Sequence, residues 1–161
     1  FIDEKNVKLF TDHHIFTREE MVSRYVILLE GYSKTLHVEA KAMLSMLHHD
    51  FLPAAERYIA QLVSVIQGKT GVDPALTSTA ERKRLTKINE LVQAVYEGAD
   101  VLAEHLAKAE GISDPLEQAK YYQQVILQDM QNIRTPADEA EGYLPQELLP
   151  YPNYEALLFS V

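Results

Sequence analysis

The sequence predicts an all-α protein: an elongated antiparallel helical bundle of one long bent helix and a two-helix hairpin, followed by an extended apolar C-terminal tail. Apolar residues recur at helical spacing along three long stretches, and no stretch shows the period-2 alternation typical of a strand. The connections between these stretches have about ten residues or fewer, which favours antiparallel neighbours. We therefore treat residues 1–161 as a single helical domain.

The longest helix is predicted over residues 17–67, after an N-terminal lead-in (1–16) that contains a short helical piece. Thr17 and Glu20 have the spacing of a capping box, and Gly68 and Gly71 are expected to end the helix. The apolar stripe consists of Met21, Tyr25, Leu28, Leu29, Tyr32, Leu36, Ala40, Met43, Leu47, Phe51, Ala55, Tyr58, Leu62 and Ile66.

Pro53 interrupts this stripe, and an interior proline removes a backbone hydrogen bond at a cost of about 3 kcal/mol. Two outcomes are consistent with the sequence: a kink in one helix, or a second helix that restarts with Asp50 as its cap. The apolar phase continues across Pro53 without slipping, which favours the kink.

A second helix is predicted over residues 78–110 and a third over 115–142, followed by a tail of residues 143–161. Ser78 with Glu81 gives another capping-box pattern, and Asp114 precedes Pro115 as a cap precedes a first helical residue. Pro136 is expected to kink or stop the third helix. The apolar stripes are Leu85, Ile88, Leu91, Val92, Val95, Leu102 and Leu106, and then Leu116, Ala119, Tyr122, Ile126, Met130 and Ile133.

Composition excludes several classes of function. The net charge of −9 opposes general attraction to nucleic acid or to an anionic membrane. The absence of cysteine excludes disulfides and thiolate sites and is compatible with the cytoplasm, where we expect the protein. No apolar run reaches the length of a membrane span, and no signal peptide is evident. Because the chain starts at Phe1 without an initiator Met, we expect a piece of a longer protein.

The sequence predicts no catalytic, cofactor-binding or metal-binding residue. No Asp or Glu has a histidine three residues later, as a carboxylate-bridged bundle requires, and no two histidines lie four residues apart. A phosphate-cradling glycine loop is also missing. We interpret the histidines as surface or partly buried side chains, namely His13, His14, His37, His48, His49 and His105.

A basic cluster at the start of the second helix consists of Arg82, Lys83, Arg84 and Lys87. Positive charge is mildly unfavourable at that end of a helix. The favoured interpretation is a solvated face, and the functional alternative is a docking patch for an acidic surface.

The tail carries five predicted anchors, which are Tyr151, Tyr154, Leu157, Leu158 and Phe159. Pro150 and Pro152 are expected to keep the approach extended. Burying a Leu or Phe side chain is worth about 1.5–3 kcal/mol, so three anchors could offset the entropy of ordering a short tail. We expect Tyr151 to dock on the domain's own helices and Phe159 on the rest of a longer chain or on a neighbouring subunit.

Several segments resemble the C-terminal region of type III glutamine synthetases, the large bacterial and cyanobacterial form. They are "NVKLF", "SRYVILLEGYSKTLHVEAKAML", "LPAAERY", "TPADEAE" and "LPYPNYEALLF". Leu149 and Ala156 depart from the family, which often has Trp and an acid there. The resemblance implies a parent that makes glutamine from glutamate, ammonia and ATP with Mg or Mn, as a ring-shaped homo-oligomer. It also implies that the active site lies on a β-rich core upstream.

Three interpretations of function remain. The favoured one is an accessory domain of an ATP-dependent ligase that serves structure, assembly or regulation, carries no active site itself, and has the catalytic core and neighbouring subunits as partners. The second is a free-standing scaffold or adaptor that binds partners through the apolar tail. The third, a metal- or ligand-binding bundle, is disfavoured by the missing Glu-x-x-His spacing.

Overall fold

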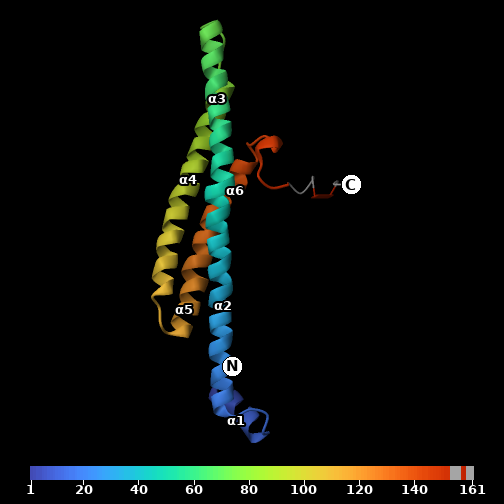
Figure 1. Ribbon diagram of the computed structural model, residues 1–161, viewed down its shortest axis with the longest axis vertical. Coiled ribbons are helices and arrows are strands. Elements are labelled where there is room, and N and C mark those ends of the chain that lie inside the picture. The colour runs from blue at the N-terminus through green and yellow to red at the C-terminus, as the bar shows by residue number, and fades with distance from the viewer. Residues whose placement is uncertain (153–156, 159–161) are drawn as a thin grey trace.

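Three long helical segments lie side by side in a computed structural model of the chain, which describes residues 1–152, 157 and 158 (Figure 1). The first segment consists of α2 (Arg18–Met46), the π-helical turn η1 (Leu47–Phe51) and α3 (Leu52–Val72). Helix α4 (Thr79–Glu110) runs back along it. The third segment consists of α5 (Pro115–Tyr121), the π-helical turn η2 (Tyr122–Ile126) and α6 (Leu127–Glu141). This arrangement confirms the predicted all-α antiparallel bundle.

Two short elements lie at the ends of the chain. Helix α1 (Glu4–Asp12) packs against the start of α2, and the 3-10 turn η3 (Gln146–Leu148) contacts α3. The described residues contain no strand. The N-terminal part of the chain therefore lies at one end of the rod, whereas α6 ends near the middle of the rod (Figure 1).

The long first segment begins as predicted but ends later. Thr17 caps α2 with the complete capping box, because its hydroxyl accepts from the Glu20 amide and the Glu20 carboxylate accepts from the Thr17 amide. The helix passes through Gly68 and Gly71 and ends at Val72 instead of residue 67. Asp73 is extended (φ −151°, ψ 117°) because the following proline disfavours helical geometry.

Pro53 causes no break between two separate helices. The chain keeps helical dihedrals from Met46 to Leu52, and the Leu52 amide donates to the Leu47 carbonyl, five residues back. This turn is wider by one residue, and it places Pro53 in the first turn of α3, where the helix needs no amide donor. Asp50 therefore does not cap a restart. The predicted irregularity at Pro53 is a π-helical turn inside one continuous segment.

In the second and third segments, one predicted helix cap is present and another is absent. Asp114 caps α5 by accepting from the Glu117 amide at 2.8 Å, as predicted. Ser78 makes no capping hydrogen bond, because its hydroxyl accepts from Arg82 Nε. Glu81, the expected partner in that capping box, pairs with Lys69 at 2.7 Å. Pro136 does not stop α6, which continues to Glu141, so of the two expected outcomes the stop is wrong.

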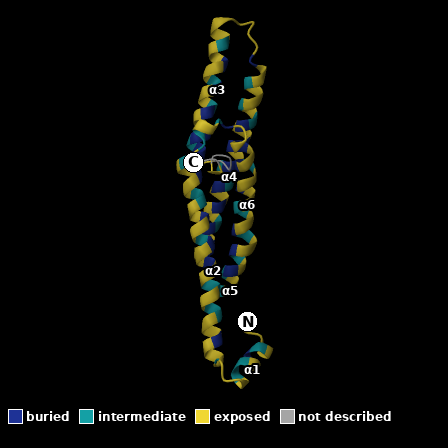
Figure 2. Ribbon diagram, turned by 90° about the vertical axis from the view of Figure 1, so that its right-hand side faces the viewer, coloured by how far each residue is buried: buried dark blue, intermediate teal, exposed yellow. Residues whose placement is uncertain are grey.

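One continuous core lies where the three segments face one another (Figure 2). Most of the predicted stripe residues are buried or partly buried, but three are exposed: Leu28 is 63% exposed, Tyr32 40% and Leu116 38%. Leu28 and Tyr32 belong to the first part of α2, which extends beyond the loop between α4 and α5 (Figure 1). The fully buried large side chains are Met21, Leu52, Ile88, Val95, Leu102, Ile126 and Ile133.

Helices α4 and α6 approach most closely at Gly98. A Cβ atom added at Gly98 would lie 2.7 Å from Cγ1 of Ile133, which is fully buried. Gly68, in contrast, has nothing within 4 Å of the same added atom. The two glycines are both helical, so they differ mainly in packing.

We therefore predict opposite effects of alanine at these two positions. Gly68→Ala should raise the free energy of unfolding by up to about 1 kcal/mol, because alanine is the better helix former. Gly98→Ala has the same helical gain, but overpacking against Ile133 should cost about 1–3 kcal/mol. Urea denaturation of both variants measures the difference, and an equal gain at both positions would contradict the close packing of α4 on α6.

Candidate functional site

The tail begins by returning over the bundle. Leu144 is 7% exposed, and Leu148 and Leu149 pack against the core. The 3-10 turn η3 brings the chain across α3 before it reaches Pro150. The first part of the predicted docking tail is therefore attached to its own domain.

Tyr151 is held by a hydrogen bond to the π-helical turn. Its hydroxyl donates to Asp50 Oδ2 at 2.7 Å, and its side chain is partly buried. Burial, and then the hydrogen bond to the Asp50 carboxylate, raise the pKa of Tyr151 to about 12. The structure thus places this predicted anchor on the domain's own long helix.

A groove lies beside Tyr151, between the α2–η1 junction and α6. Its volume is about 570 Å³, and its lining is mainly apolar. Three of the four methionines of the chain line it, which gives the groove an adaptable surface. The rim is charged and includes an ion pair between Arg134 and Asp138 at 3.3 Å. The main apolar lining residues are Met43, Met46, Leu47, Phe51, Leu127 and Met130.

The structure describes two further predicted anchors, Leu157 and Leu158, and both are exposed. Leu157 is 60% exposed and Leu158 is 68% exposed. Tyr154 and Phe159 lie outside the described residues. Where the outer part of the tail docks remains a prediction.

The basic cluster is divided between internal contacts and solvent. Lys87 Nζ pairs with Glu139 Oε1 at 2.7 Å, and this hydrogen bond raises the pKa of Lys87. Arg82 donates to Ser78. Lys83 and Arg84 are exposed. Arg82 is exposed as well, so three of the four side chains of the predicted patch lie at the surface.

Two histidines are engaged in hydrogen bonds inside the bundle. His105 Nδ1 lies 2.6 Å from Asp129 Oδ2 and joins α4 to α6. His37 Nδ1 lies 2.9 Å from the Tyr122 hydroxyl, and its Nε2 lies 3.5 Å from Glu110 Oε1. Burial, with a contribution from Glu110, raises the pKa of Tyr122. His13, His14, His48 and His49 are exposed.

A small polar pocket of about 250 Å³ adjoins His37. Ser33 contributes to its wall, is 3% exposed, and has a hydroxyl without a hydrogen-bond partner among the residues that the structure describes. The pocket is lined by residues of α2, by the last residue of α4 and by Gln118 of α5. It therefore lies where the end of α4 and the start of α5 pack against α2.

The described part of the chain contains no cluster of metal-ligand side chains. Within residues 1–152 and 157–158, no group of three or more His, Asp or Glu side chains could hold an ion. The six glycines are scattered and form no phosphate-binding loop. In the same described part of the chain, no helix combines the length and apolar character that crossing a bilayer requires.

Sequence reasoning missed the partner of Tyr151 and the groove. Asp50 was considered only as a helix cap, because local spacing does not reveal a hydrogen bond between residues 101 positions apart. A partial signal for the groove is present: Met43 and Met46 lie three residues apart, on one side of the same helix.

The architecture and its internal polar contacts define an elongated all-α domain whose candidate functional surfaces are for interaction. Comparison with known proteins then shows which proteins the chain resembles. Residues 1–70 match the family described as the glutamine synthetase C-terminal domain. The chain is 37% identical over its full length to a glutamine synthetase of Butyrivibrio fibrisolvens. It is 26% identical over 97% of its length to a type-3 glutamine synthetase of Dictyostelium discoideum.

These matches confirm the resemblance to the C-terminal region of glutamine synthetases that is seen in its sequence. A third relative, a glutamine synthetase of Bacteroides fragilis, is 23% identical over 99% of the chain. The chain spans only 23%, 22% and 22% of the length of these three relatives.

The Tyr151–Asp50 contact gives a prediction about alkaline titration. Because the folded pKa of about 12 exceeds the ordinary value of 10.0, this contact contributes stability below about pH 10 and loses it as pH rises toward 12. Tyr151→Phe should lower the free energy of unfolding at pH 7 by about 1 kcal/mol. It should also remove one late-titrating phenol from the absorbance titration near 295 nm.

Tyr32→Phe is the matched control, because it removes an exposed tyrosine of the same molecule. This variant should keep the late-titrating phenol and the stability at pH 7. The difference between the titrations of wild type and Tyr151→Phe gives the titration of Tyr151 itself. If that phenol titrates near pH 10, Tyr151 does not form the hydrogen bond to Asp50 in solution.

Proposed function

We propose that this chain is the accessory C-terminal domain of an ATP-dependent glutamine synthetase, which forms glutamine from glutamate, ammonia and ATP. The observation that carries the proposal is the match of the whole chain to under a quarter of a longer glutamine synthetase at 37% identity. The domain serves structure, assembly or regulation. The parent is a cytoplasmic ring-shaped homo-oligomer that uses Mg or Mn, and its active site lies upstream of this domain.

The use of polar side chains in the bundle supports an accessory role. The partly buried histidines, His37 and His105, are committed to partners on neighbouring helices. Lys69 and Lys87 likewise pair with Glu81 and Glu139 on facing elements. These groups hold helices together, and no described cluster positions a nucleophile beside a base.

The alternative of a free-standing adaptor receives no support from the relatives. Each matched relative is a longer protein named as a glutamine synthetase, and the alignment covers almost the whole of this chain in all three. The exposed apolar residues that motivated the adaptor are equally expected of a domain that docks within a larger polypeptide.

We predict that the isolated 161-residue chain forms no glutamine. The assay contains glutamate, ammonia and ATP with Mg or Mn, and a mock purification from the same host controls for host enzyme. The complete parent polypeptide should be active. Turnover by the isolated chain above the mock control would contradict the assignment of the active site to the upstream part.

Deletion of this domain from the parent tests its role. A parent that ends just before Phe1 should lose thermal stability or ring assembly, measured by calorimetry and light scattering. Unchanged activity, assembly and stability after deletion would contradict an accessory role in structure or assembly.

A further inference from the structure

The first part of α2, residues 21–32, is rich in apolar side chains. Eight of its twelve residues are apolar or aromatic, namely Met21, Val22, Tyr25, Val26, Ile27, Leu28, Leu29 and Tyr32. At 3.6 residues per turn, seven of these lie on one broad face, whereas Ile27 lies on the opposite side of the helix, among Ser23, Arg24 and Glu30. We call residues 21–32 the projecting end of α2.

The bundle covers only part of this projecting end. Ile27 and Leu28 are each 63% exposed, and Val22 is 43% exposed. Met21 is fully buried, and Val7 of α1 is 4% exposed. Glu110, the last residue of α4, pairs with Lys41 and His37, so α4 ends before it reaches the projecting end. α2 therefore extends past the α4–α5 loop, with α1 at its tip (Figure 1).

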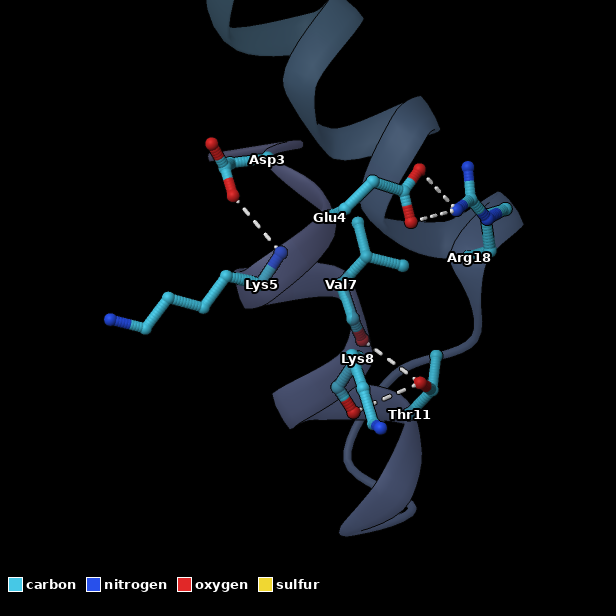
Figure 3. Close-up of polar contacts among 7 residues, drawn as sticks. All are labelled: Asp3, Glu4, Lys5, Val7, Lys8, Thr11 and Arg18. Carbon is cyan, nitrogen blue, oxygen red and sulfur yellow. Dashed lines mark hydrogen bonds and ion pairs between the residues drawn. The ribbon is translucent and has the colours of Figure 1, made fainter.

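Several charged side chains near this surface have partners within α1, α2 or the segment that joins these two helices. Arg18 Nη2 contacts both carboxylate oxygens of Glu4 at 2.6 Å, joining α1 to α2 (Figure 3). Lys34 pairs with Glu30, and the Arg24 guanidinium lies 4.5 Å from the centre of the Phe16 ring. The exposed surface consequently presents apolar side chains whose nearby charges are already compensated, which favours an apolar partner.

The position of the rest of the polypeptide identifies that partner. The family is described as a C-terminal domain, and about three quarters of the Butyrivibrio relative lies outside the matched part. In such a protein, the preceding chain joins at Phe1. Phe1 and Ile2 are 49% and 39% exposed, and α1 starts two residues later at the same end of the rod as the projecting end.

We propose that the projecting end of α2, together with α1, is the surface on which the upstream part of the same polypeptide docks. The proposal rests on the proposed function. The short connection from Phe1 to α1 gives the upstream part a high effective concentration at this surface, so docking within one chain is favoured over docking with another. The exposed apolar side chains of Val22, Ile27 and Leu28 are buried once this contact forms.

The test uses Ile27→Glu, with Val65→Glu as the matched control. Val65 is a β-branched residue that is 46% exposed on α3, away from the projecting end. In the isolated chain, neither variant should shift the melting temperature appreciably, because both side chains are exposed. In the complete parent, Ile27→Glu should speed limited proteolysis within residues 1–17 by about tenfold, the change expected for a loss of about 1.4 kcal/mol.

Val65→Glu should leave proteolysis of the parent unchanged. Equal cleavage of wild-type parent and Ile27→Glu parent would overturn the proposal. Protection of residues 1–17 from proteolysis that disappears on dilution to single chains would also overturn it, because a second copy would then cover the surface. A second readout guards against misfolding of the variant: amides of residues 21–32 in wild-type parent should exchange hydrogen about tenfold more slowly than in the isolated chain. Failure to form glutamine by the wild-type parent would instead contradict the proposed function.

Discussion

The fold depends on one buried seam that three long helical segments share. Each segment is amphipathic along most of its length, and a single helix cannot bury its apolar stripe alone. Along α4, Ile88, Val95 and Leu102 lie fully buried between the other two segments. Gly98 allows α6 to come close enough for Ile133 to fill the seam. The π-helical turn η1 accommodates Pro53 without interrupting the first segment.

The same seam explains why the molecule has distinct surfaces for its own stability and for other contacts. Where all three segments overlap, histidines and ion pairs connect neighbouring helices, as His105 does with Asp129. Where α2 extends past the α4–α5 loop (Figure 1), Ile27 and Leu28 are each 63% exposed. Near the middle of the rod, the tail returns over α3 and ends its described path at the Tyr151–Asp50 contact.

Local signals predicted the fold well, and long-range contacts account for the errors. The capping roles of Thr17 and Asp114 could be predicted because the hydrogen bonds of a helix cap join residues only three or four positions apart. Ser78 has the same sequence pattern, but Glu81 forms an ion pair with Lys69 across the loop. Local spacing does not predict such a contact. Periodicity predicts Leu28 in the core, because the pattern shows which face of a helix is apolar but does not show how far the neighbouring helix extends. Tyr151 was predicted as an anchor, whereas its partner Asp50 depends on how the tail returns.

The central claim is that the seam stabilises the domain, while the projecting end of α2 gains little from it. Native-state hydrogen exchange of the isolated chain, read residue by residue, tests this claim most directly. The account predicts the slowest exchange in Ile88–Leu106 of α4 and in α6, limited by global unfolding, and at least about tenfold faster exchange in residues 21–32. Equal protection of residues 21–32 and α4 would contradict the account, because the projecting end would then be stabilised as strongly as the seam itself.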